Sequence, residues 1–312
     1  MRCNFAIFVV EKTGNRPAFT LKKFLTVLAT AFCFLPAGGK GLKYRSVSID
    51  TAAGKMKVKV LQPKEADARV PGILWIHGGG YMTGGTYMVR VSCGKMLAER
   101  YGAVVVSPEY RKAGEAPYPA ALEDCYAALE WMYVHADELG IDRTRIVVGG
   151  ESAGGGLTAA VCLYARDKGK IPVAFQLPLY PMLDCEDTES SADNHGLFWG
   201  TVRNHRGWKL YLGDLSGTAD VPSYASPARA TDYANLPPCY TYVLDGEPFY
   251  TETLAYVKNL QAAGVDAKVD VYPGNTHAFD ILLPWQDRSK RAKRRLCEEY
   301  ERIIMKPASM RR

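Results

Sequence analysis

Several patterns that mark common classes of protein are absent from this sequence. Its eight cysteines form no C-x-x-C pair, and none lies at a zinc-site spacing from a histidine, so the sequence predicts no metal site. The glycine-rich segment 147–156 matches neither G-x-x-x-x-G-K-[ST] nor G-x-G-x-x-G, which argues against a phosphate-binding loop. Internal repeats and low-complexity tracts are also lacking. What remains is a chain of 312 residues with 47% apolar content, which is typical of a globular protein with a substantial core.

An apolar run long enough for a comfortable membrane span is missing as well. The run 24–39 is shorter than the roughly 20 apolar residues that a span requires. It follows Lys22 and Lys23 in the order of a secretory signal, but only after a segment that includes the acidic Glu11. We expect an apolar helix that packs over the domain, with a signal as the alternative. Cysteines inside apolar runs favour a reducing compartment, so we expect a cytoplasmic protein without stable membrane insertion and leave secretion open.

Negative charge is the scarcer sign, and the net charge is +6. Much of the positive excess lies in residues 287–303, where Leu296, Tyr300 and Ile303 recur at helical spacing. This pattern predicts a terminal helix with one buried stripe and a solvated basic face. Because no recognisable binding module accompanies the basic run, we expect no nucleic-acid partner.

From about residue 44 the sequence alternates between strand-like and helix-like segments. Ala53 and Gly54 join the first two strands, which predicts an antiparallel start. The later alternation predicts a mostly parallel eight-stranded sheet with helices on both faces. Residues 186–235 interrupt the rhythm, and we expect them to lie over the carboxyl edge of the sheet. The predicted strands are 44–50, 56–62, 72–78, 103–110, 145–150, 173–181, 239–246 and 267–274.

The sequence GESAG at residues 150–154 matches G-x-S-x-G between a predicted buried strand and a helix. A sharp strand-to-helix turn would expose the hydroxyl of Ser152, and side chains at positions 150 and 154 would collide, which explains the glycines there. The following helix N-terminus would offer N–H groups and a positive dipole to an oxyanion. The context therefore predicts that Ser152 is a nucleophile.

A second motif, HGGGY at residues 77–81, follows the predicted strand 72–78. Such a loop supplies part of the oxyanion hole in lipases and esterases, because consecutive glycines let backbone amides approach the oxyanion. We expect the N–H groups of Gly79, Gly80 and Ala153 to be the donors. His77 is expected to shape the loop, and Tyr81 to line the substrate pocket.

The five histidines are at positions 77, 135, 195, 205 and 277. His277 lies in a loop directly after the last predicted strand, which is the place of the base when the chain order is serine, acid, histidine. The acid should follow the preceding strand, where the candidates are Asp245, Glu247 and Glu252. We favour Glu247 from its place in the turn, and Asp245 stays open as the alternative.

These residues together resemble the hormone-sensitive-lipase-like branch of the α/β-hydrolase fold, the bacterial carboxylesterases. The resemblance spans about residues 43–305 and rests on seven motifs in order: HGGGY (77–81), PEYRKAGEAPYPAALEDCYAALEW (108–131), GESAGG (150–155), YPMLD (180–184), YASPAR (224–229), EPFYTE (247–252) and HAF (277–279). It implies hydrolysis of short-chain acyl esters, with no metal or cofactor and a small acyl ester as substrate. One departure is Glu247, where the family usually has aspartate.

The resemblance also implies a catalytic domain over residues 41–312 and a small helical cap formed by residues 1–40 and roughly 186–218. Phe198, Trp199 and Trp208 would then be pocket walls, although ordinary packing inside the cap explains these aromatics equally well. A homodimer is a further implication of the resemblance.

Two other functions are compatible with these motifs. The same fold and residues would serve a deacetylase of acetylated sugars or an amidase, and nothing in the sequence separates these from a carboxylesterase. A non-catalytic small-molecule receptor is disfavoured, because serine, histidine and a carboxylate are all present.

Overall fold

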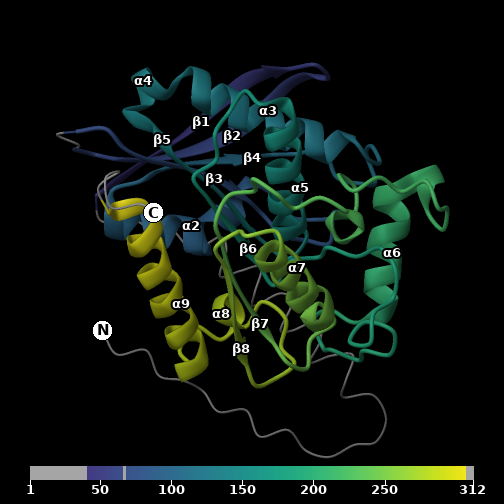
Figure 1. Ribbon diagram of the computed structural model, residues 1–312. Helices are drawn as coiled ribbons and strands as arrows, with labels where there is room; N and C mark the ends of the chain where they lie inside the picture. Colours follow the sequence, from purple (N-terminus) through teal and green to yellow (C-terminus); the bar gives the residue numbers. More distant parts are fainter. Residues whose placement is uncertain (1–40, 66–67, 307–312) are drawn as a thin grey trace, which may run out of the picture. The chain divides into compact units, whose positions relative to one another are not determined.

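The structure, a computed structural model, describes residues 41–65 and 68–306. It contains an eight-stranded sheet with the strand order β1-β2-β4-β3-β5-β6-β7-β8 (Figure 1). The strands are β1 Leu42–Thr51, β2 Gly54–Pro63, β3 Val70–Ile76, β4 Val104–Pro108, β5 Ile141–Glu151, β6 Phe175–Leu179, β7 Cys239–Leu244 and β8 Ala267–Tyr272. The predicted segment 1–40 of the cap lies outside the described residues.

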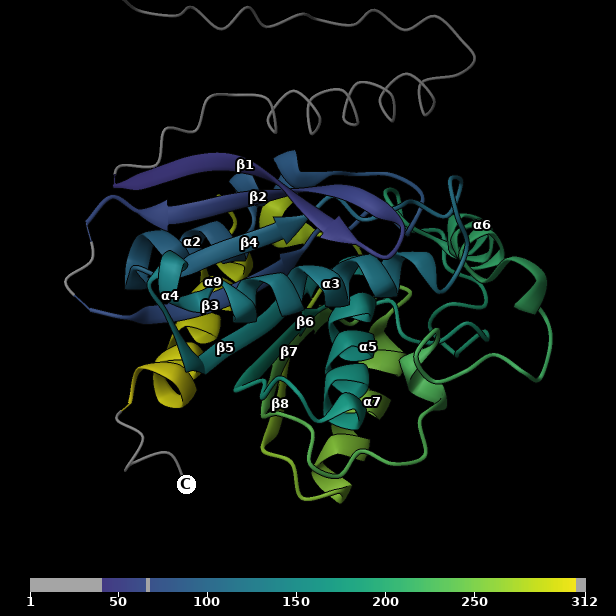
Figure 2. The same cartoon turned by 90° about the horizontal axis from the view of Figure 1, so that it is seen from above.

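The antiparallel start is confirmed, because β2 pairs antiparallel with both β1 and β4. Every other pairing in the sheet is parallel. Figure 2 shows the strands running from β1 and β2 at one edge to β7 and β8 at the other. Strands β4, β6 and β7 are buried along their whole length. Strand β3, whose continuous apolar sequence predicts a strand covered on both faces, is buried at every position after Val70.

Helices cover both faces of this sheet. The helices are α2 Cys93–Tyr101, α3 Ala120–Val134, α4 Ala136–Leu139, α5 Ala153–Lys168, α6 Thr201–Leu212, α7 Tyr250–Ala262, α8 Phe279–Leu282 and α9 Asp287–Tyr300, with short η1 Thr86–Val91, η2 Gly213–Leu215, η3 Pro227–Arg229 and η4 Glu301–Met305. One core cluster includes side chains of α3, α5, α6 and α7, and a second includes those of α2, α8 and α9. Helix α9 has a buried stripe that includes Leu296 and Tyr300, so the predicted terminal helix is confirmed.

Residues 186–235, which interrupt the predicted alternation of strands and helices, contain α6, η2 and η3 and no strand. Trp208 and Tyr211 of α6 belong to the first core cluster, so this segment is packed onto the domain.

The described cysteines are free thiols. Within residues 41–65 and 68–306, no helix has both the length and the apolar character needed to cross a membrane.

The parallel strands determine where the candidate residues meet. Ser152 follows β5, Glu247 follows β7 and His277 follows β8, while the HGGG loop follows β3. Since parallel strands end at the same edge of a sheet, all these residues are delivered to one edge, where sites form in open α/β sheets.

Candidate active site

Ser152 lies at the tip of a sharp turn between β5 and α5, with φ 58° and ψ −121°. Positive φ is strained for a residue with a side chain, so the surrounding structure must enforce it. A Cβ on Gly150 would lie 2.4 Å from the Ile76 carbonyl oxygen, and one on Gly154 would lie 2.1 Å from the same oxygen. The collision predicted for side chains at these two positions is therefore present, and its partner is strand β3.

His277 approaches this serine from the loop after β8. Its Nε2 lies 2.8 Å from Ser152 Oγ, although 125 positions separate the two residues in the sequence. Tyr180 and Phe249 meet the imidazole edge-to-face, each with ring centroids 5.1 Å away. The ring is thus held between two aromatic side chains with one nitrogen facing the hydroxyl.

The three candidate acids have three different partners. Glu247 is fully buried, and its Oε2 lies 2.5 Å from His277 Nδ1 while Oε1 accepts a hydrogen bond from Leu244 N at 2.8 Å. Asp245 instead accepts a hydrogen bond from Gly274 N at 2.9 Å. Glu252 accepts one from Leu183 N at 2.6 Å. Of the three, Glu247 is the carboxylate next to the imidazole.

The HGGG loop adopts conformations that favour glycine. Gly79 has φ 124° and Gly80 has φ 60°, both in the left-handed region. A Cβ on Gly79 would lie 2.1 Å from Thr83 O, and one on Gly80 would lie 1.8 Å from the indole of Trp199. Ala153 is the first residue of α5, where backbone N–H groups have no partner within the helix.

His77 has the structural surroundings that the sequence predicts. Its ring stacks on Tyr110 with centroids 4.2 Å apart, and its Nδ1 is 2.8 Å from the Gly78 carbonyl oxygen. Burial lowers the pKa of His77 to about 4, because desolvation disfavours the charged form. This histidine is therefore neutral near pH 7 and shapes the loop.

The predicted pocket residues are in two different environments. Tyr81 is 1% exposed, stacks on Tyr211 with centroids 3.9 Å apart and donates its hydroxyl to Met182 O at 3.1 Å. Trp208 is also buried and contacts the Tyr81 ring. Trp199 is only partly buried, and its ring centroid is 6.4 Å from that of His277. The structure thus brings Trp199 to the site and packs Tyr81 and Trp208 in the interior.

A buried polar cluster behind the site was not anticipated. Asp280 accepts hydrogen bonds from the hydroxyls of Tyr180 at 2.8 Å and Tyr242 at 3.0 Å. Glu151, directly before the serine, accepts one from Trp75 Nε1 at 2.9 Å. Burial, and then the charge of nearby Asp280, raise the pKa of Glu151 to about 8. Tyr180 begins the YPMLD motif and Asp280 directly follows the HAF motif, but the motifs carry no indication that these polar groups lie together.

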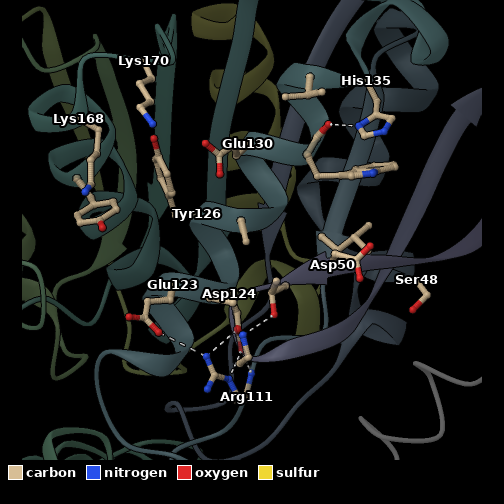
Figure 3. Close-up of a pocket in the computed structure, with 18 residues that line it drawn as sticks. Ser48, Asp50, Arg111, Glu123, Asp124, Tyr126, Glu130, His135, Lys168 and Lys170 are labelled. Atoms are coloured by element: carbon tan, nitrogen blue, oxygen red, sulfur yellow. Dashed lines mark hydrogen bonds and ion pairs between the residues drawn. The ribbon is translucent and has the colours of Figure 1, made fainter.

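A separate groove lies away from this chemistry. It has a volume of about 910 Å³ and lies between the β1–β2 turn, α3 and α5, with Arg111, Tyr126, Glu130 and Lys168 among its lining residues (Figure 3). None of the residues that approach Ser152 lines it. This groove is therefore not the substrate site that the sequence predicts.

Comparisons with known proteins agree with this geometry. A family model described as the alpha/beta hydrolase fold matches residues 73–281. The chain belongs to this family. Esterase LipI of Mycobacterium tuberculosis is 35% identical to this α/β-hydrolase over 234 residues, which cover 73% of this chain and 72% of that protein. Carboxylesterase NlhH of the same species is 33% identical over 234 residues, covering 73% of each chain.

Solved structures give the same result for this α/β-hydrolase. A bacterial heroin esterase superposes with a TM-score of 0.82 at 34% identity, covering 92% of each chain. An esterase of Pyrobaculum calidifontis superposes with a TM-score of 0.79 at 29% identity, covering 91% of this chain and 93% of that chain. The predicted membership of the bacterial carboxylesterases is confirmed, and the α/β-hydrolase is a carboxylic ester hydrolase.

Proposed function

We propose that this α/β-hydrolase is a serine esterase in which Ser152 is the nucleophile, His277 the general base and Glu247 the acid that orients His277. The observation that carries the proposal is one continuous chain of hydrogen-bonding groups. It runs from Ser152 Oγ to His277 Nε2 at 2.8 Å, and from His277 Nδ1 to Glu247 Oε2 at 2.5 Å. Nucleophile, base and orienting carboxylate in this sequence of contacts are the parts required for acyl transfer.

The proposed reaction has two halves. Ser152 Oγ attacks the ester carbonyl carbon while its proton passes to His277 Nε2, and Glu247 stabilises the imidazolium that forms. When the tetrahedral intermediate collapses, the bond to the alcohol oxygen breaks and the alcohol takes the proton from Nε2. Water then attacks the acyl-serine by the same route, which releases the carboxylic acid and regenerates the Ser152 hydroxyl.

The oxyanion of each intermediate would be bound by the N–H groups of Gly79, Gly80 and Ala153. Support comes from the left-handed backbone of the two glycines and from the place of Ala153 at the start of α5. The dipole of a helix N-terminus favours negative charge at this point. Losing one such donor typically lowers kcat by about 10²–10³.

We also propose that the acyl group is short. The indole of Trp199 lies so close to Gly80 that a Cβ there would be 1.8 Å from it, and Ser152 is only 6% exposed. An indole at this place leaves little room beside the reacting carbonyl. A pocket of fixed size discriminates by roughly tenfold or more for each methylene that does not fit.

Two measurements test the proposal. Ser152→Ala should lower the turnover of p-nitrophenyl acetate and butyrate by more than about 10⁴-fold, and should abolish labelling by a fluorophosphonate. Unchanged turnover in this variant would refute the assignment of Ser152 as the nucleophile.

For the wild-type enzyme, kcat/KM should fall for acyl chains beyond about six to eight carbons. Equal activity on long chains would refute the short-acyl preference.

A further inference from the structure

The loop that presents Glu247 is held by a distant part of the chain. We call residues 245–249, between β7 and α7, the acid loop, and residues 188–201 of the insertion the clamp segment. Local support for Glu247 comes from two hydrogen bonds with Leu244: Glu247 N donates to Leu244 O at 3.3 Å, and Leu244 N donates to Glu247 Oε1 at 2.8 Å. Gly246 N also donates to Gly274 O at 2.8 Å, which joins the acid loop to the loop of His277. Gly274 N donates to Asp245 Oδ1 at 2.9 Å at the same junction, and further side-chain contacts come from the clamp segment.

Asn194 of the clamp segment contacts the residue before Glu247. Its Nδ2 donates to Gly246 O at 3.2 Å and to Ser190 O at 3.1 Å, and its Oδ1 accepts from Gly196 N at 2.9 Å. The backbone of Asn194 is itself fixed, because its N–H donates to Thr201 Oγ1 at 2.7 Å and its carbonyl accepts from Thr201 N at 2.9 Å. A side chain held at this many points can define the position of the carbonyl that it binds.

Ser190 contacts the residue after Glu247. Its hydroxyl donates to Pro248 O at 2.7 Å and accepts from Thr251 N at 3.0 Å. Thr251 is in the first turn of α7, where backbone N–H groups lack partners within the helix, so Ser190 satisfies one of them from outside. The acid loop is therefore tied to the clamp segment on both sides of the carboxylate.

We propose that Ser190 and Asn194 are positioning residues for ester hydrolysis. By holding the carbonyl groups of Gly246 and Pro248, they keep the Glu247 carboxylate in line with His277 Nδ1. The inference rests on the role proposed for Glu247. It also gives the clamp segment two functions, since the same loop places Trp199 against Gly80. The clamp segment would thereby determine both the position of Trp199 beside the substrate and, through Glu247, the orientation of His277.

A double-mutant cycle separates positioning from general structural support. We expect Asn194→Ala and Ser190→Ala each to lower kcat for p-nitrophenyl acetate by about tenfold, with little change in KM, because misplacing a catalytic group by a fraction of an ångström slows the chemical step. In a Glu247→Gln background, the same substitutions should lower kcat by less than about twofold, because the group that they position is already disabled. His195→Ala is the matched control, since this side chain is exposed in the same segment and pairs with Asp193; its kcat should equal that of the wild type.

Thermal unfolding of each variant establishes that the protein measured is folded, and Ser190→Ala, which removes a single oxygen, serves if Asn194→Ala does not fold. Equal factors in the wild-type and Glu247→Gln backgrounds would overturn the positioning role while leaving the proposed function intact. So would an unchanged kcat in the single variants. If Glu247→Gln alone leaves kcat unchanged, the proposed acid is wrong, and the positioning role fails together with it.

Discussion

The turn at Ser152 and the acid loop at Glu247 lie at the same edge of the sheet, but different forces fix them. Around Ser152 the restraint is steric: side chains at 150 and 154 would meet the backbone of β3 within 2.4 Å. Around Glu247 the restraint is polar, and it includes hydrogen bonds from Asn194 and Ser190, which are 52 and 58 positions away from their partners in the chain. A single added carbon atom at position 150 or 154 would displace the serine turn, whereas the loss of one hydrogen bond to the acid loop leaves the other hydrogen bonds in place.

The largest expected effect breaks the steric restraint. In Gly154→Ala the new Cβ would lie 2.1 Å from Ile76 O, so the turn must move. We expect kcat/KM to fall by more than about 10²-fold, since a shift of about 1 Å in a catalytic group costs that much. The free energy of unfolding should fall by about 1–3 kcal/mol, as for other overpacked sites. Ester turnover and urea unfolding measure the two effects.

Gly114→Ala is the control for this substitution, because a Cβ there has nothing within 4 Å and the residue does not have positive φ. Its activity and stability should stay at the wild-type level. A Gly154→Ala variant as active as this control would show that the turn tolerates a side chain.

A smaller effect is expected from substitutions in the acid loop, which test whether Glu247 or Asp245 is the acid. Glu247→Asp shortens the acid by one methylene, about 1.5 Å, and so lengthens its contact with His277 Nδ1. We expect kcat to fall by about tenfold to 10²-fold in steady-state turnover of p-nitrophenyl acetate. Asp245→Asn keeps an oxygen acceptor for Gly274 N and should change kcat little. The reverse order of effects would make Asp245 the acid.

A further prediction concerns Trp199, the residue of the clamp segment that we propose limits the length of the acyl chain. Trp199→Ala opens the space beside Gly80, so the ratio of kcat/KM for octanoate to acetate esters should rise by about tenfold or more. Trp285→Ala removes a tryptophan side chain that is 64% exposed and is the matched control. An unchanged ratio in Trp199→Ala would mean that another group limits the acyl chain.

The last prediction concerns the pH dependence of stability, not turnover, and comes from Glu151. Its pKa rises from 4.5 to about 8 in the folded protein, so between these values the folded state holds a proton that the unfolded state has lost. Stability from this group is complete below about pH 4.5 and is lost as pH rises toward 8, with a slope of at most about 1.4 kcal/mol per pH unit. Glu151→Gln should flatten this part of the stability profile from urea unfolding. Parallel profiles for the two proteins would contradict the shift.

The two regions also explain which parts could be predicted from the sequence. The serine turn and the HGGG loop are visible as local patterns, because the glycines are required by collisions within a few residues of the nucleophile or with one neighbouring strand. The sheet could be predicted from the alternation of strand-like and helix-like segments, and the continuous apolar sequence of β3 indicates burial on both faces. The place of His277 and of the candidate acids follows from their positions after strands, although the sequence leaves Asp245 open beside Glu247.

What the sequence could not provide depends on contacts between distant segments. Asn194 and Ser190 are ordinary polar residues in an irregular segment, and nothing local indicates that the acid loop lies beside them. Similarly, the aromatic character of Tyr81 and Trp208 indicates burial but not the surface against which they are buried. The sequence therefore predicts Tyr81 at the pocket and leaves Trp208 open between the pocket wall and packing inside the cap, whereas both side chains are buried. Glu151 and Asp280 lie close enough for their charges to interact because β5 and α8, which follows β8, reach the same edge of the sheet.

The place of β8 has a consequence for how activity arises. Among the described residues this strand is the last in sequence and occupies an edge of the sheet, yet it delivers His277 to the hydroxyl at residue 152. A nascent or refolding polypeptide that has assembled every earlier strand would therefore bear the nucleophile without its base. Recovery of ester turnover during refolding would accordingly report the docking of the final strand, and would lag behind signals from the centre of the sheet.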